Sequence, residues 1–372
     1  MTHGWEVKKL GEVCEIKTGK KDVNEGNPNG KYPFFTCAKL HTYSDDFSFD
    51  TEALLIAGNG DVGNVSYYKG KFEVYQRTYV LCNFKNIFPI FLFYILSGYL
   101  KQNMFEQKLG NTMPYIKVGM LTNFEIPLPP LSEQQRIVTI LNEAFEAINQ
   151  AKAHAEQNLN NAKELFESYL QSVFETKGED WEENKLGEVC EISSKLIDPK
   201  KPEYQDFIHI GAGNIESRKG ILLDLKTAKE ENLISGKFLF DESMVLYSKI
   251  RPYLMKVVNC NFKGLCSADI YPLVPSENKL IKEFLYHMLL TKKFTDYAIL
   301  GSQRAGMPKV NREYLFAYKF FLPSLTEQQA IVAKLDALSE QTQKLERLYE
   351  QKLADLEELK KSILQKAFNG EL

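Results

Sequence analysis

An internal repeat constrains the fold of this chain more than any other feature. The stretch "PLPPLSEQQRIV" at 127–138 recurs as "FLPSLTEQQAIV" at 321–332, an offset of 194 residues. Upstream, "WEVKKLGEVCEI" at 5–16 recurs as "WEENKLGEVCEI" at 181–192, an offset of 176 residues. The offsets differ because the intervening sequences differ in length. A repeated supersecondary plan of this kind predicts two equivalent halves, each a variable block followed by a helix.

Each "EQQ" motif has the signature of a helix start. Ser132 is followed three residues later by Gln135, and Thr326 by Gln329, a pattern typical of a capping box. Prolines precede both motifs and prevent the helix from extending backwards. The motif is therefore interpreted as a folding signal and not as catalytic machinery.

Heptad spacing follows both helix starts. Apolar residues alternate by four and three over residues 131–175 and 325–372, a period that favours a left-handed coiled coil. We expect the two helices to pair antiparallel, with the globular blocks at opposite ends. The predicted seam contains Ile137, Leu141, Ala144, Ile148, Ala151, Ala155, Ala162, Leu165 and Tyr169 in the first helix, and Ile331, Leu335, Leu338, Leu345, Tyr349, Leu356, Leu359 and Ile363 in the second, with polar Asn158 and Lys352.

The two variable blocks are predicted to be rich in β-strands. Residues 1–130, the first block, and residues 176–324, the second block, contain short alternating runs and one short apolar helix each, at 91–96 and 284–289. The predicted class is α+β: two β-rich domains joined by two long antiparallel coiled-coil helices in a pseudo-twofold repeat. The segment "GNGDVG" at 58–63 fits a dinucleotide-binding pattern, but strand-like sequence follows it, so a turn is the preferred interpretation.

Charge and composition narrow the class of protein. The net charge is −3, yet the first and second blocks carry +1 and +2 while the helical segments 131–175 and 325–372 carry −4 and −2. A mild basic excess is compatible with nucleic-acid binding if the charges cluster on one face. The most apolar run, 87–100, is too short for a membrane span and predicts a buried helix. Six cysteines without a CxxC pair indicate cytosolic thiols and a cytoplasmic protein.

The order of block and helix, repeated twice, resembles the specificity subunit of a Type I restriction–modification system. The resemblance covers nearly the whole chain. It is carried by the two "P-x-L-[ST]-E-Q-Q-x-I-V" helix starts, the two "LGEV" openings, and "LYSKIRPYLMKV" followed by "FKGLCSADIYPL" in the second block.

The resemblance implies a sequence-specific, non-catalytic DNA reader. Two target-recognition domains (1–130 and 176–324) would each read half of a bipartite double-stranded site. Two conserved helical spacers (131–175 and 325–372) would dock two methyltransferase subunits, and restriction–motor subunits would join that core. S-adenosylmethionine, ATP and magnesium would belong to those partners, with no cofactor, metal or membrane association in this chain.

Candidate DNA-binding residues come from polar side chains near predicted turns. Arginine suits guanine, asparagine and glutamine suit adenine, and lysine more often contacts phosphate. The candidates in the first block are Asn59, Asp61, Arg77, Asn111, Thr112, Tyr115 and Lys117. Those in the second block are Lys249, Arg251, Lys256, Gln303, Arg304, Lys309 and Asn311.

Two alternatives remain open at this point. One is the DNA-reading subunit of a modification-only methyltransferase complex that has no nuclease. The other is a coiled-coil scaffold whose β-rich domains bind proteins. An enzyme is the least favoured class, because the sequence has no Walker lysine, H-E-x-x-H motif, nucleophile elbow or amino-methyltransferase motif.

The absence of these motifs generates a prediction. The purified chain by itself should transfer no methyl group from S-adenosylmethionine to DNA and should not cut it. Labelled S-adenosylmethionine, a mixed-sequence duplex and the chain at high concentration provide the assay. Methyl transfer by the single chain would contradict the division of labour that the resemblance implies.

Overall fold

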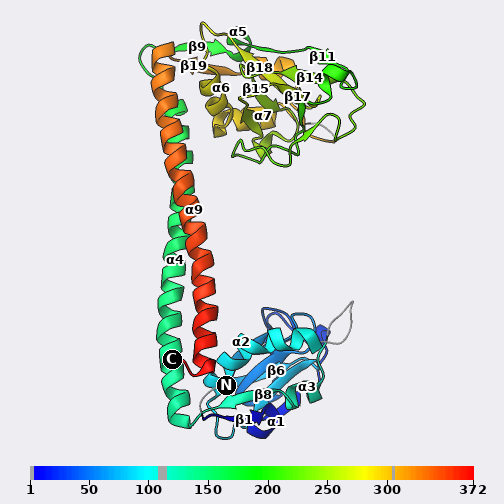
Figure 1. Cartoon of the computed structure of the whole chain (residues 1–372), viewed down its shortest axis with the longest axis vertical. Helices are drawn as coiled ribbons and strands as arrows, with labels where there is room; N and C mark the ends of the chain where they lie inside the picture. Colours follow the sequence, from blue (N-terminus) through cyan, green and yellow to red (C-terminus); the bar gives the residue numbers. More distant parts are fainter. Residues whose placement is uncertain (1–3, 108–114, 304–305) are drawn as a thin grey trace. The chain divides into compact units, whose positions relative to one another are not determined.

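The computed structural model describes residues 4–107, 115–303 and 306–372 (Figure 1). The chain packs as two compact units. Unit 1 comprises Met1–Gln157 with Tyr349–Leu372, and unit 2 comprises Asn158–Leu348. Each unit therefore contains one variable block and a portion of both long helices. The sequence predicts a different division, into two blocks and two helical segments with separate functions. That division stays a prediction, because units 1 and 2 are defined by packing alone.

The first block is built around a mixed sheet. Its strand order is β2-β7-β5-β6-β3-β4, with β3 parallel to β6 and the other neighbours antiparallel. A separate two-stranded ribbon pairs β1 with β8. The elements are β1 (Glu6–Lys9), α1 (Leu10–Val13), β2 (Glu15–Thr18), η1 (Val23–Glu25), β3 (Tyr32–Phe35), β4 (Thr42–Ser44), β5 (Phe49–Ala57), β6 (Val65–Val74), β7 (Thr78–Cys82), α2 (Pro89–Gln107), α3 (Val118–Thr122) and β8 (Glu125–Leu128).

The second block repeats this plan with its sheet split in two. One sheet has the order β10-β18-β15-β16, the other β11-β14-β17-β12-β13, and β19 pairs with β9. The elements are β9 (Glu182–Lys185), α5 (Leu186–Val189), β10 (Cys190–Ile192), β11 (Leu196–Ile197), η2 (Pro202–Tyr204), β12 (Ile208–Ile210), β13 (Lys226–Thr227), β14 (Lys237–Phe240), β15 (Val245–Ser248), η3 (Pro252–Leu254), β16 (Val257–Asn259), β17 (Gly264–Cys266), β18 (Ile270–Pro275), α6 (Lys282–Leu289), α7 (Lys292–Leu300), α8 (Arg312–Phe316) and β19 (Lys319–Leu322).

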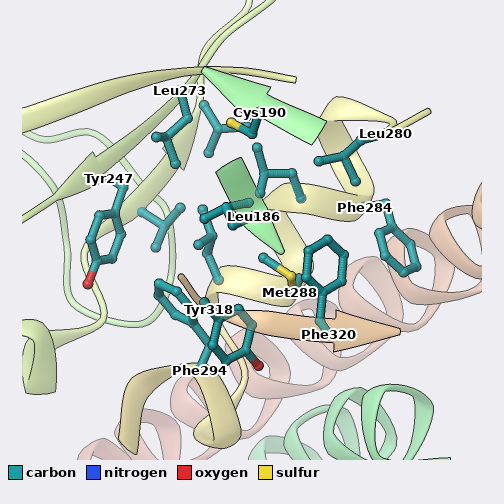
Figure 2. Close-up of a cluster of buried hydrophobic side chains, with 14 of the residues drawn as sticks. Leu186, Cys190, Tyr247, Leu273, Leu280, Phe284, Met288, Phe294, Tyr318 and Phe320 are labelled. Atoms are coloured by element: carbon teal, nitrogen blue, oxygen red, sulfur yellow. The ribbon is translucent and has the colours of Figure 1, made fainter. Parts of the chain in front are cut away.

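The core of the second block lies between its first sheet and helices α6 and α7. Figure 2 shows Tyr247 of β15, Phe284 of α6 and Phe294 of α7 among the side chains that fill it. All three are almost fully buried. Burying one large apolar side chain stabilises the fold by about 1.5–3 kcal/mol, so this cluster holds the sheet and helices together as one body. The corresponding core of the first block includes Phe91 of α2, which confirms the buried helix predicted from the apolar run.

Identical hydrogen bonds close both blocks. The amide of Leu10 donates to the carbonyl of Phe124 at 2.9 Å, and the amide of Leu186 donates to the carbonyl of Tyr318 at 2.8 Å. These residues are related by the two offsets found in the sequence. The repeated "LGEV" openings thus form equivalent short helices, α1 and α5, which pack against the segment that precedes each long helix.

The glycine-rich segment at 58–63 forms a turn between two strands, as predicted. Gly60 and Gly63 have φ values of +61° and +78°, which glycine adopts without the steric cost that a side chain would add. Strand β6 begins at Val65, so this loop leads into a strand and not into the helix that a dinucleotide site requires. The dinucleotide interpretation fails for this physical reason.

The two long helices are α4 (Leu131–Glu175) and α9 (Leu325–Asn369). Both begin one residue before the predicted N-cap. In α4 the carbonyl of Pro130 accepts from the amides of Glu133 and Gln134, so Ser132 lies in the first turn and is not the N-cap. In α9 the hydroxyl of Ser324 accepts from the amide of Glu327, and Thr326 is likewise inside the helix. The predicted capping boxes were therefore wrong, although the helices themselves were predicted correctly.

The middle glutamine of each motif is a buried clamp that the sequence analysis missed. The amide nitrogen of Gln134 donates to the carbonyls of Asn86 and Pro129, and its oxygen accepts from the amide of Phe88 at 2.9 Å. Gln328 makes the same three contacts, with the carbonyls of Lys279 and Pro323 and the amide of Ile281. Both side chains are fully buried. Each clamp joins the start of a long helix to the segment that leads into α2 or α6.

Within unit 1 the two long helices run antiparallel. Lys152 of α4 forms an ion pair with Glu357 of α9 at 2.6 Å, and the ammonium of Lys360 lies 5.1 Å from the ring centre of Phe145. As the residue number rises along α4, that of its neighbour in α9 falls. Such exposed ion pairs add at most about 1 kcal/mol, so they indicate register more than stability.

Apolar seam residues near the blocks pack against the blocks themselves. Leu141 of α4 is fully buried in the core of the first block, and Leu335 of α9 in that of the second. By contrast Leu165, Leu345 and Leu359 of the predicted seam are 51%, 38% and 47% exposed. Some residues of the heptad pattern therefore pack against the blocks, and others are exposed to solvent.

The buried clamp generates a stability prediction. Gln134→Ala should lower the free energy of unfolding by about 2–4 kcal/mol, because one buried and two partly buried backbone groups are left without their partner. The matched control is Gln135→Ala, which truncates the exposed neighbour on the same turn and should change stability by less than about 0.5 kcal/mol. Urea unfolding monitored by circular dichroism measures both. Equal effects of the two variants would show that the clamp contributes nothing.

Candidate functional site

Three segments of the first block meet beside the end of strand β5. The amide of Ile116 donates to the carbonyl of Gly58 at 3.0 Å, and the amide of Gly58 donates to the carbonyl of Arg77 at 3.0 Å. These bonds bring together residues that are up to 58 positions apart in the sequence. The candidates that they gather, here named the first surface, are Asn59, Asp61, Arg77, Tyr115 and Lys117.

The members of the first surface differ in availability. Arg77, Tyr115 and Lys117 are exposed, whereas Asn59 and Asp61 are half-buried. The carboxylate of Asp61 lies 2.6 Å from the ammonium of Lys101, so this candidate is already paired. Asp61 therefore helps to hold the loop, and the exposed cations and tyrosine are the groups free to meet a ligand. The candidates Asn111 and Thr112 lie outside the described residues.

The second block brings two distant segments together in the same way. The amide of Arg251 donates to the carbonyl of Pro308 at 2.9 Å, and the amide of Val310 donates to the carbonyl of Lys249 at 2.8 Å. The turn after β15 thus lies against the strand-like segment before α8. The candidates gathered here, named the second surface, are Lys249, Arg251, Lys256, Gln303, Lys309 and Asn311; Arg304 lies outside the described residues.

Side-chain contacts divide the second surface into structural and open positions. Lys249 is 8% exposed and donates to the carbonyl of Ala268, and its ammonium lies over the ring of Tyr271. Lys256 is half-buried and donates to the carbonyl of Ala212 at 2.5 Å. The side chain of Asn311 caps α8 by accepting from the amide of Tyr314 at 2.7 Å. The side chains of Lys249, Lys256 and Asn311 therefore bind backbone groups of the protein and hold the second surface in place.

Arg251 and Gln303 are the open positions of the second surface. Both side chains are exposed, and no hydrogen bond or ion pair holds either one within the residues that the structure describes. Lys309 is half-buried, and its backbone pairs with Ile250 across an isolated bridge. The geometry thus favours Arg251 and Gln303 over Lys249 as groups available to a ligand.

The electrostatic environment of Lys249 indicates a local excess of positive charge. Burial lowers the pKa of its ammonium, and the cations of Lys309 and Arg312 lower that pKa further. Asp269 is the carboxylate that acts in the opposite direction. Like charges held together in this way attract an anionic ligand.

Both surfaces rest on the same backbone scaffold. The hydroxyl of Tyr79 donates to the carbonyl of Ile116 at 2.8 Å, and that of Tyr271 donates to the carbonyl of Val310 at 3.2 Å. Ile116 and Val310 are equivalent in the repeat. The position that follows them is Lys117 in one block and Asn311 in the other. One framework therefore presents different polar side chains in the two halves.

A third segment completes each surface, and the sequence analysis missed it. In the first block the loop at 36–41 is held by the amide of Asp61, which donates to the carbonyl of Cys37 at 3.3 Å. In the second block the loop after β12 is held by Lys256 through Ala212. Both loops follow the strand that pairs in parallel with its neighbour. Only strand pairing brings these loops into place, so motif searching had no signal for them.

Metal sites and membrane spans have no support in the described part of the chain. Within residues 4–107, 115–303 and 306–372, no cluster of three or more His, Cys, Asp or Glu side chains could hold a metal ion. No helix in the described part of the chain combines the length and the apolar character that a membrane span requires. The two polar surfaces are thus the strongest candidate sites.

Comparisons with known proteins point to one family. Residues 2–160 and 178–357 match the family described as the Type I restriction modification DNA specificity domain. The chain is 34% identical over 406 residues to the Type I restriction enzyme EcoDI specificity subunit of Escherichia coli, which covers 99% of this chain and 88% of that protein.

Solved structures show the same fold. A chain solved in work on complex assembly and conformational transition of the type I R-M system aligns with a TM-score of 0.78 at 20% identity, over 100% of this chain and 99% of that chain. The HsdS subunit of Thermoanaerobacter tengcongensis aligns with a TM-score of 0.58 at 20% identity, over 100% and 98% of the two chains. At this level of identity the likeness concerns the fold alone.

Strand β12 contains a buried histidine, His209. Nδ1 of His209 lies 2.7 Å from a carboxylate oxygen of Glu231. Burial lowers the pKa of His209 below its ordinary value of 6.5, although Glu231 acts in the opposite direction. Below about pH 6.5 His209 is protonated in the unfolded chain, whereas in the folded chain its imidazole stays neutral until the pH reaches the lower folded pKa. Stability should therefore fall as the pH drops from about 7 towards the folded pKa.

We predict that His209→Asn reduces this acid sensitivity. Urea midpoints at pH 7.5 and 5.5 should differ less for the variant than for the wild type, because the buried imidazole is gone. His154→Asn replaces an exposed histidine of α4 and serves as the control, with the wild-type pH dependence expected. A His209→Asn chain as acid-sensitive as the wild type would contradict the prediction.

Proposed function

Because the chain belongs to the family of Type I restriction–modification specificity subunits, we propose that it reads a bipartite DNA site with one block for each half. Members of this family are non-catalytic DNA-recognition proteins. The observation that carries the proposal is the repeated scaffold, on which equivalent hydrogen bonds present different polar side chains in the two blocks. A common framework with distinct contact residues is what independent reading of two half-sites requires.

The contact chemistry of the two surfaces fits double-stranded DNA. In the second block Gln303 can pair with adenine, and exposed arginine can contact guanine or phosphate. In the first block Arg77 and Lys117 are exposed cations suited to phosphate, beside the partly exposed ring of Tyr115. We extend the proposal to the loops at 36–41 and after β12, since they border these side chains.

We further propose that the long helices form the spacer between the blocks and dock two methyltransferase subunits. The antiparallel contacts of Lys152 with Glu357 support a paired spacer. The exposed leucines at 165, 345, 348 and 359 provide apolar positions that a partner could cover. Restriction–motor subunits would complete the assembly. S-adenosylmethionine, ATP and magnesium would be bound by the partners.

Exchange of one block tests the proposal. Residues 1–130 are replaced by the equivalent block of another family member, ending immediately before α4 so that the whole helix is kept. Expressed in cells with the methyltransferase subunit, the chimera should methylate a motif in which only one half has changed. Sequencing of methylated genomic DNA reports the motif.

The reciprocal exchange of residues 176–324 is the matched control and should change the other half alone. A change in both halves after a single exchange would contradict independent reading. A folded pair of chimeras that leave the wild-type motif intact would place DNA recognition outside the two blocks.

A further inference from the structure

Left-handed backbone conformations gather at one place in the second block. Seven non-glycine residues of the described chain have positive φ. Four are asparagine or aspartate, which tolerate this region better than other side chains do. The remaining three are Arg218, Arg251 and Met255, with φ values of +67°, +51° and +48°. Backbone conformations of this kind cluster at functional sites, where the surrounding structure holds them in place.

Hydrogen bonds join these three residues. The amide of Arg218 donates to the carbonyl of Met255 at 3.2 Å. Arg251 and Met255 flank the single turn of η3, in which the amide of Leu254 donates to the carbonyl of Arg251 at 2.9 Å. Arg218 is therefore fixed beside the turn that contains Arg251, although 33 residues separate them.

The equivalent turn of the first block uses glycine. The loop between β5 and β6 reaches the left-handed region at Gly60 and Gly63, where no side chain is present. The turn between β15 and β16 has Arg251 and Met255 in that region instead. Glycine would adopt the conformation at lower cost, so Arg251 holds its conformation at a backbone cost that glycine would avoid.

The two guanidinium groups are free and lie in a basic environment. Both arginines are exposed, and neither has a hydrogen-bond or ion-pair partner for its side chain among the described residues. Lys249, Lys309 and Arg312 add positive charge close by. The nearby carboxylate of Glu216 is taken by Lys219 at 2.7 Å. The surface is thus prepared for an anion.

We propose that Arg218 and Arg251 form a clamp for the DNA phosphate backbone, which sets the position of the second block on its half-site. The inference rests on the proposed function and adds Arg218, which the sequence analysis did not identify. The planar guanidinium matches phosphate with two parallel hydrogen bonds. A fixed backbone limits the freedom that each side chain gives up on binding. Base reading would then fall to other residues of the second surface, such as Gln303.

Salt dependence of DNA binding tests the clamp. The full-length chain, assembled with its methyltransferase partner, first selects duplexes from a random-sequence pool, and an enriched duplex is then used for titrations. Removal of one arginine–phosphate pair should make the slope of log K against log salt shallower by about 0.9. Arg218→Ala and Arg251→Ala should each show this change, and the double variant about twice as much. The selected motif should stay that of the wild type.

Two controls separate the clamp from general effects of charge and folding. Lys263→Ala removes an exposed cation from the turn at the other end of β16 and should leave the slope unchanged. Arg251→Gly removes the side chain but suits the left-handed backbone. It should melt at or above the wild-type temperature and still show the shallower slope. Asn232→Gly, at another left-handed position of the block, should change neither the melting temperature nor the salt slope.

The possible outcomes separate the clamp from the proposed function. A wild-type complex that enriches no sequence overturns the proposed function and the clamp that rests on it. An enriched motif with unchanged slopes in the double variant overturns the clamp alone. Loss of preference at one base position with an unchanged slope also overturns it, because the arginines would then read a base.

Discussion

The architecture depends on a buried glutamine at the start of each long helix. Gln134 and Gln328 bind three backbone groups each, from the segment before the helix and from the segment that enters α2 or α6. A buried polar side chain is tolerated only when its hydrogen-bonding groups are satisfied. The direction in which each helix leaves its own block is therefore coupled to the packing of that block's core.

Repeated hydrogen bonds also hold the two candidate surfaces in place. A tyrosine on the central sheet, Tyr79 or Tyr271, holds the carbonyl of Ile116 or Val310, and the neighbouring amide binds the end of β5 or the residue after β15. Backbone groups make most of these bonds, so they place few demands on side-chain identity. The side chains between them can then differ, as Lys117 and Asn311 do. The same scaffold therefore presents different side chains in the two blocks.

The second surface shows how structural and contact roles can be divided among residues of similar charge. Lys249 and Lys256 use their ammonium groups on the carbonyls of Ala268 and Ala212. They fix the turn and the adjacent loop, while Arg251 stays exposed. Lys309 and Arg312 lie close enough to Lys249 to lower its pKa, so these two cations add positive charge to this part of the block.

The sequence by itself determined the elements that local patterns encode. The repeat predicted two equivalent halves, the heptads predicted α4 and α9, and alternating runs predicted β-rich blocks, because helical and strand periodicities are properties of neighbouring residues. Motif reasoning also found most segments that line the two surfaces.

Only the tertiary structure decided which side chains on these surfaces are available to a ligand. Lys249 is buried because its ammonium binds the carbonyl of Ala268 and lies over the ring of Tyr271. Arg218 lies beside the turn of Arg251 because its amide donates to the carbonyl of Met255. These contacts follow from strand pairing between distant segments, which no local pattern encodes. The choice between Gln134 and Gln135 had the same origin, since burial against the block selects one of two identical neighbours.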